Sequence, residues 1–204
     1  IKKLLPKGLA LNQAKKQVVT AQEKVNPKKT TDATSPLFTF DYLGYSFLVR
    51  EPQKNGNKKN TEYCRSVTVD IAEKKVMRLK TRIARSFNDF GKTGNFGLLN
   101  DRIRYLTKNF SVYNPKVGGK KIAGIYHSYP LVSDDAQGLK VLDNFLRNAV
   151  LSNSGRIFSK SSLRLTAEQK RKILAHSFVR GHREKSFVYF SGVRIKEIQE
   201  CWKN

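Results

Sequence analysis

The sequence predicts an α+β fold, in which short strands and a β-hairpin precede a mainly helical bundle. Up to residue 69 the apolar residues cluster in β-branched and aromatic runs, whereas from Asp70 onward they recur at helical spacing. An Asn55-Gly56 pair in a polar setting adds a strong hairpin signal between two strand-like runs. We therefore expect a first domain at 1–69 and a second, helical domain at 70–204.

The first domain is predicted to contain short strands joined by long polar connections. Residues 1–16 have the pattern of a helix end and a turn, and Gln17–Thr20 is an apolar, β-branched run typical of a strand. Residues 22–36 are rich in Pro, Thr and Ser, which favours a loop. Leu37–Arg50 and Tyr63–Asp70 then follow as the two arms of a hairpin with a long basic tip.

The second domain is predicted to begin with two long helices. Asp70 and Glu73 have the spacing of a capping box, and Gly91 is the expected end of the first helix. The second helix is expected over Phe96–Phe110. The core residues predicted for the first helix are Val76, Leu79, Ile83, Phe87 and Phe90.

Beyond Phe110 the pattern predicts an extended segment and three further helices. Lys120–Tyr129 follows a run of Pro and Gly and is expected to be a strand or an extended connection. One helix is expected to start at Ser133, a second to run from Thr166 to Gly181, and a short third to be capped near Ser191.

The charge of the chain predicts an acidic partner. Forty Lys and Arg residues against sixteen Asp and Glu give a formal net charge of +24. The excess is spread evenly along the chain, which favours a folded body with a basic face over a neutral domain with a basic tail. Nucleic acid is the expected partner; an anionic membrane surface or a solubility effect is the alternative. No apolar run is long enough to span a membrane, and we expect a cytoplasmic protein that does not bind membranes.

The cysteines and histidines do not have the spacing of a metal site. Cys64 and Cys201 each stand alone, and neither has a histidine at ligand spacing. We expect both to be reduced core residues. His176 and His182 lie in a basic stretch, and we expect neither to bind a ligand.

Two motifs of the first domain resemble those of a known enzyme family. Gly8–Lys15 has the form GLxLNxxK, and Phe40–Phe47 has the form FxYLGYxF. Their order and spacing resemble the bacterial reverse transcriptases of the group II intron, retron and antiphage-defence lineages, with the type 3 defence-associated enzymes closest in overall impression. The resemblance implies the end of the palm and the thumb of an RNA-directed DNA polymerase. Because the chain starts at Ile1, we expect the catalytic part to lie upstream.

The resemblance implies roles for six residues. Asn12 and Lys15 match the element near the incoming nucleotide, although Lys15 could also be a solvated turn lysine. The other four match the turn of the hairpin that grips the primer, and these are Tyr42, Leu43, Gly44 and Tyr45. The alternative is an ordinary aromatic hairpin packed on the thumb, and Leu43 is expected in the core under either interpretation.

A basic stripe runs along the first predicted helix of the second domain. It lies beside the apolar stripe, Lys75 flanks it, and its members are Lys74, Arg78, Arg82 and Arg85. Such a helix can dock on a core and contact the phosphates of a duplex without reading its sequence. The alternative is a solvated helix face.

Two motifs resemble catalytic or phosphate-binding sites but lack residues that those sites require. Gly91-Lys92-Thr93 lacks the earlier glycine of a phosphate loop, and the acidic pair in Ser133–Asp135 is expected to serve a helix start rather than a metal. We therefore expect no cofactor on this chain, with Mg²⁺ held by the palm of the parent enzyme, and no polymerase activity from this chain alone. The expected partners are an RNA template and DNA primer or a structured non-coding RNA, the upstream fingers and palm, and a second polymerase subunit. A free-standing, non-catalytic RNA-binding module of a ribonucleoprotein is the alternative.

Overall fold

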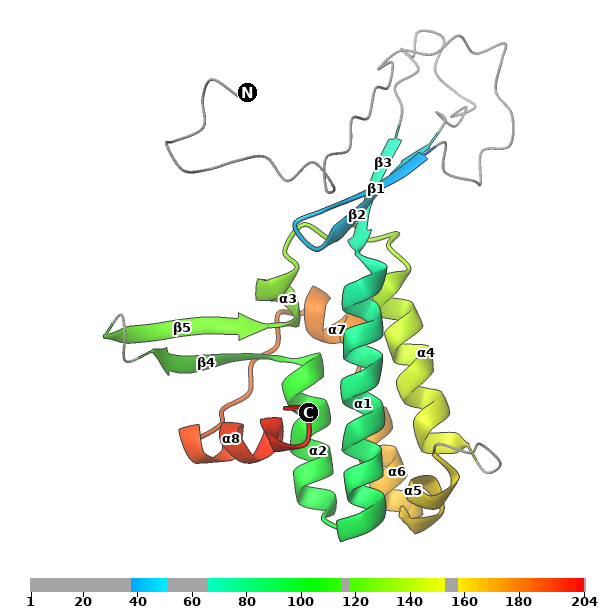
Figure 1. The fold of residues 1–204 in the computed structure, drawn as a ribbon, viewed down its shortest axis with the longest axis vertical. Coiled ribbons are helices and arrows are strands. Elements are labelled where there is room, and N and C mark those ends of the chain that lie inside the picture. The colour runs from blue at the N-terminus through cyan, green and yellow to red at the C-terminus, as the bar shows by residue number, and fades with distance from the viewer. Residues whose placement is uncertain (1–37, 51–65, 115–117, 153–157, 204) are drawn as a thin grey trace, which may run out of the picture. The chain divides into compact units, whose positions relative to one another are not determined.

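The computed structural model describes residues 38–50, 66–114, 118–152 and 158–203, and these confirm the predicted α+β fold (Figure 1). Strands β1, β2 and β3 form one antiparallel sheet in that order, and β4 pairs with β5 in a second. The strands are β1 (Phe38–Tyr42), β2 (Tyr45–Arg50), β3 (Ser66–Ile71), β4 (Asn109–Asn114) and β5 (Gly119–Gly124). The helices are α1 (Glu73–Thr93), α2 (Phe96–Thr107), α3 (Ile125–Ser128), α4 (Gly138–Leu151), α5 (Ser159–Arg164), α6 (Ala167–Leu174), α7 (Phe178–Arg183) and α8 (Gly192–Glu200).

The chain forms two compact units. The described part of the first consists of 38–40, 47–50 and 66–67, where the rings of Phe40 and Phe47 stack with centroids 4.9 Å apart. The second consists of the hairpin turn 41–46 and everything from Thr68 onward. The predicted strand at Gln17–Thr20 lies outside the described residues, as do Asn55-Gly56, Asn12, Lys15 and Cys64.

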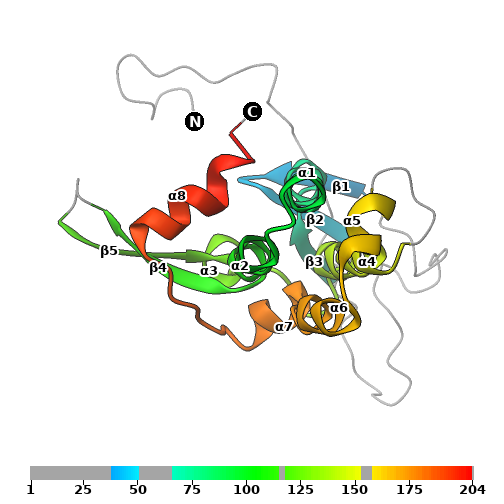
Figure 2. The ribbon, with the colours of Figure 1, turned by 90° about the horizontal axis from the view of Figure 1, so that it is seen from below.

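Helix α1 is the central element of the second unit. It contacts α2, α4 and α5, and Figures 1 and 2 show it beside α2 and α4. Its predicted apolar stripe is buried, with Ile83 and Phe87 fully inaccessible to solvent. The predicted end at Gly91 is wrong: Gly91 is helical and packs tightly on Ser161, and the helix ends at Gly94 in the left-handed conformation.

The predicted role of Asp70 as the cap of α1 is also wrong. The residue before α1 is Ala72, which offers no side-chain cap. The Asp70 carboxylate instead accepts hydrogen bonds from the backbone N–H groups of Gln137 and Gly138, at 2.8 and 3.0 Å, and so caps α4. A carboxylate placed there also complements the dipole of α4.

The start of α4 lies five residues later than predicted, because Ser133 and Asp135 serve β3 instead. The Ser133 hydroxyl accepts the N–H of Val69, and the Asp135 carboxylate accepts the hydroxyl of Thr68 at 2.6 Å. The expectation that these residues start the helix is therefore wrong: they anchor the preceding loop to a strand.

The helix predicted over residues 166–181 is divided into α6 and α7. The predicted start at Thr166 is confirmed, and it forms a capping box: the Thr166 hydroxyl accepts from Gln169 N, and the Gln169 side chain accepts from Thr166 N. The chain breaks after Leu174 because Asp143 of α4 accepts hydrogen bonds from Ser177 Oγ and Phe178 N, both at 2.6 Å, and Ser177 begins α7. A carboxylate on another helix thus sets a boundary that the local pattern does not reveal.

The segment after α2 forms the β4–β5 hairpin and then α3. Helix α2 ends at Thr107, not at Phe110, because buried Asn109 joins three segments. Its side chain donates to the carbonyls of Gly181 and Ser186 and accepts the N–H of Tyr126. The cap of α8 by Ser191 is as predicted. No helix in the described part of the chain is long and apolar enough to cross a membrane.

Candidate nucleic-acid interface

The structure brings two of the predicted sites together, the hairpin turn and the start of the basic helix. The N–H of Ala72, just before α1, donates to the carbonyl of Gly44 at 3.0 Å. The Lys75 stem passes close to Gly44, such that a Cβ at position 44 would lie 3.3 Å from Lys75 Cε. The turn and the first turn of α1 are therefore one local surface within the second unit.

The hairpin turn holds a leucine in an unusual backbone conformation. Leu43 and Gly44 have φ angles of +49° and +88°, the pair of positive values that a two-residue type I′ turn requires. Glycine adopts such angles freely, but a leucine there is strained. Such strain is concentrated at functional sites in proteins.

The same leucine is exposed. Leu43 is 80% accessible to solvent and Tyr42 62%, so the expectation that Leu43 belongs to the core is wrong. Tyr45 faces the other way, is buried, and meets the ring of Tyr129 edge to face with centroids 6.1 Å apart. The hairpin thus presents an apolar tip to solvent while Tyr45 anchors its base.

The first half of the basic stripe is free to meet a ligand. Lys74 and Arg78 are exposed, and Lys75 is partly exposed. None of the three forms an ion pair with a carboxylate among the described residues. Their charges lie within about two turns of the helix, next to the hairpin tip.

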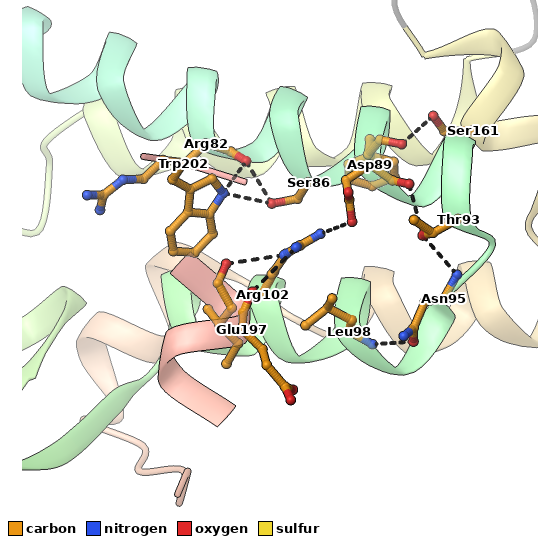
Figure 3. A network of polar contacts seen from close by, with 12 residues as sticks. Arg82, Ser86, Asp89, Thr93, Asn95, Leu98, Arg102, Ser161, Glu197 and Trp202 are labelled. Carbon is orange, nitrogen blue, oxygen red and sulfur yellow. Dashed lines mark hydrogen bonds and ion pairs between the residues drawn. The ribbon is translucent and has the colours of Figure 1, made fainter. Parts of the chain in front are cut away.

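The second half of the stripe contacts the C-terminal segment, and Figure 3 shows Trp202 beside Arg82 and Ser86. The guanidinium of Arg82 lies over the indole of Trp202, 5.2 Å from the ring centroid, and Arg85 donates to the carbonyl of Trp202 at 3.2 Å. The indole N–H in turn donates to the carbonyl of Arg82 and the hydroxyl of Ser86. The predicted stripe is therefore not one continuous exposed face.

Arg102 of α2 fixes this C-terminal segment in place. Its side chain is 3% exposed and forms an ion pair with Asp89 of α1 (Figure 3). It also donates to the carbonyl of Ile198 in α8, at 3.2 Å. A buried guanidinium that bridges three helices leaves little freedom for Trp202, two residues beyond α8.

Several of the acidic side chains are engaged in contacts that hold the fold together. They cap helices, bond a strand hydroxyl or pair with arginines of other helices, and they are Asp70, Asp89, Asp101, Asp135 and Asp143. Among the described residues, none of these carboxylates forms an ion pair with Lys74, Lys75 or Arg78.

A cavity of about 180 Å³ lies behind the basic stripe. Arg82 contributes to its lining together with Tyr105 and Tyr129, and no acidic residue lines it. Burial lowers the pKa of the Arg82 guanidinium, and the neighbouring Arg78 charge lowers it further. Burial raises the pKa of both tyrosines, while the charge of Arg82 opposes the rise.

The two histidines that the sequence singled out have structural partners. His176 bonds the side chain of Asn100 at 3.0 Å, and burial together with nearby cations lowers its pKa to about 4. His182 bonds the carbonyl of Tyr129 at 2.9 Å and so helps to position that tyrosine. Cys201 is a free thiol whose pKa is raised by burial.

Sequence reasoning missed Tyr129 and Trp202 as members of this region. Neither lies near α1 in the chain, and no spacing connects them to it. No group of His, Cys, Asp and Glu that could hold a metal occurs among the described residues. Comparisons with protein-family models, with curated proteins and with solved structures found no match.

Proposed function

We propose that this protein binds duplex or structured nucleic acid through the hairpin tip and the exposed basic side chains at the start of α1. The observation that carries the proposal is the junction of the two: an exposed, strained Leu43 next to Lys74, Lys75 and Arg78, which have no acidic partner among the described residues.

The chemistry of the surface favours binding to the phosphate backbone over base readout. Lysine and arginine neutralise phosphates and release counterions, which supplies affinity that is independent of sequence. The apolar tip, Tyr42 and Leu43, offers a surface for packing against a sugar or a base. Together they would hold a strand in place without selecting its sequence.

Within this function, we assign the chain to the template- and primer-holding part of an RNA-directed DNA polymerase, in the setting of antiphage defence. The FxYLGYxF motif supports this assignment, because the structure folds its central residues into a tight turn at the base of the basic helix. The metal-binding carboxylates and the polymerase step would then belong to the upstream palm, with Mg²⁺ as its cofactor.

The salt dependence of binding tests the proposal. The double variant Lys74→Gln/Arg78→Gln should bind a short RNA or DNA duplex more weakly at every sequence. The slope of log K against log salt should fall by about 1.8 for a B-form duplex, about 0.9 for each lost phosphate contact.

A matched control removes the same charge elsewhere. Lys140→Gln/Arg147→Gln changes two exposed basic residues of α4 and should leave the slope nearly unchanged. If both double variants lowered the slope equally, the affinity would come from the net charge alone and the proposed surface would be wrong. Binding that depended strongly on base sequence would also contradict it.

Attachment to a polymerase is tested in the full-length parent protein. Primer extension that is lost in the Gly44→Ala variant while duplex binding persists would support a primer-holding role, since a misplacement of about 1 Å can lower a rate about a hundredfold. If the parent extends no primer, the chain is instead a free-standing RNA-binding module.

A further inference from the structure

We infer that the cavity beside Arg82 is a binding pocket for a phosphate group of the bound nucleic acid, with Arg82 as its charged ligand and the Tyr129 and Ser128 hydroxyls as further donors. The inference rests on the proposed function for the source of the phosphate. It concerns a separate set of contacts from the hairpin tip and the exposed lysines.

The cavity is built where α1, α2 and α3 meet the β4–β5 hairpin. Leu79 and Arg82 come from α1, Tyr105 from α2, and Ser128 and Tyr129 from the end of α3. At about 180 Å³ it has room for a phosphate and part of its sugar. A concave site of this kind is suited to holding a single phosphate group. A flat surface would instead contact several phosphates along the nucleic-acid backbone.

Arg82 is held in place but has no counter-charge. Its carbonyl accepts the Trp202 indole N–H at 3.0 Å, and its guanidinium lies over the same indole in a cation–π contact. Within the part of the chain that the structure describes, the guanidinium donates no hydrogen bond to a protein acceptor and pairs with no carboxylate. A partly buried guanidinium has lost hydration that an anion would replace.

The surroundings of Arg82 favour a phosphate. Arg78 lies near enough to affect the titration of both Arg82 and Tyr129, so a second positive charge acts on the same place. A planar guanidinium can offer two parallel N–H groups to two phosphate oxygens. No acidic side chain lines the cavity to repel the anion.

Tyr129 connects the pocket to the hairpin. Its ring meets the ring of Tyr45 edge to face, and its carbonyl accepts from His182. Burial raises the pKa of its hydroxyl, which therefore stays protonated and able to donate at neutral pH. The Tyr45–Tyr129 pair would thus link the two contacts of the bound nucleic acid, the strand on the hairpin tip and the phosphate in the pocket.

Trp202 gives a direct assay, because it is the one tryptophan of the chain and it contacts Arg82. Titration with inorganic phosphate should change its fluorescence in a saturable way, compared with chloride at equal ionic strength. Arg82→Met should weaken this binding by at least about tenfold. Tyr129→Phe, which removes only a hydroxyl, should weaken it less, and the control Arg147→Met on α4, which lines no part of the cavity, should leave it unchanged.

A saturable signal that is lost in Arg82→Met and kept in Arg147→Met supports the pocket. If phosphate and chloride act alike on the unaltered protein, the inference is wrong, whatever the variants do. If Arg82→Met fails to fold, Tyr129→Phe decides: phosphate binding unchanged in that variant would remove Tyr129 from the site and overturn the assigned donor set.

Short oligonucleotides identify the source of the phosphate and separate the pocket from the proposed function. Arg82-dependent affinity that appears only with a 5′- or 3′-terminal phosphate indicates an end group, whereas equal dependence without one indicates an internal phosphodiester. Both outcomes support the pocket. Nucleic-acid binding that is insensitive to Arg82→Met would overturn the pocket while leaving the hairpin and α1 surface intact.

Discussion

Replacement of Leu43 by asparagine should make the protein more stable and bind nucleic acid less tightly. A leucine with a φ angle of +49° loses about 1 to 2 kcal/mol relative to an ordinary conformation. Asparagine tolerates the left-handed region, and Asn-Gly is the preferred pair of a type I′ turn. The Leu43→Asn variant should recover much of that loss.

The gain is not offset by lost packing, because 80% of Leu43 is accessible to solvent. The buried remainder of its side chain contributes at most about 0.5 kcal/mol. The net gain in the free energy of unfolding is therefore about 0.5 to 1 kcal/mol, which corresponds to an increase in Tm of about 1 to 4 °C for a chain of this size. Loss of an apolar contact with the ligand should weaken duplex binding about fivefold.

Thermal and urea unfolding measure the first effect, and fluorescence anisotropy with a labelled duplex measures the second. The control is Val193→Asn, which makes the same kind of change at a residue that is 69% exposed in the first turn of α8 and has no positive φ. It should bring no gain. A Leu43→Asn variant less stable than the unaltered protein would refute the strain argument, and unchanged binding would refute the role of the leucine as a contact.

Three further substitutions test the account of the fold. Gly44→Ala should lower the free energy of unfolding by about 1 to 2 kcal/mol, because alanine is strained at a φ of +88°. The control is Gly192→Ala, where an added Cβ would meet open space. Asp70→Ala should destabilise by about 1 to 2 kcal/mol in urea unfolding, because α4 loses its cap; a neutral result would contradict the assignment. His176 has a lowered pKa of about 4, so the unfolded state binds more protons and stability should fall as the pH drops from about 6.5 toward 4. The loss in the free energy of unfolding is on the order of 2 kcal/mol after allowance for partial exposure. If the His176→Gln variant lost stability with falling pH as steeply as the unaltered protein, the pH dependence would belong to other groups.

The features that sequence reasoning predicted well are those set by neighbouring residues. The apolar stripe of α1 follows from a period of 3.6, and the capping box of Thr166 and Gln169 follows from a spacing of three. The cap of α8 by Ser191 is of the same kind. Each depends on residues within a few turns, so the chain itself brings them together.

The predictions that were wrong concern helix caps and boundaries that depend on residues distant in the sequence. Asp70 had the spacing to cap its own helix, but α4, 67 residues further on, presents its unpaired N–H groups to the carboxylate. Asp143 interrupts the helix predicted through Ser177 for the same reason. A carboxylate binds whichever N–H groups the tertiary structure brings within reach, and sequence spacing does not rank distant candidates.

By itself, the sequence determined the strongly basic character of this protein, its α+β class and an amphipathic helix with a basic stripe. Only the tertiary structure decided how those charges are presented: Arg82 and Arg85 contact Trp202 and Arg82 also lines a cavity, while Lys74 and Arg78 remain exposed near the hairpin turn. The physical reason is that charge and periodicity are properties of a local stretch of chain. Exposure depends on what packs against that stretch, and here Trp202 lies 120 positions from the arginine it contacts.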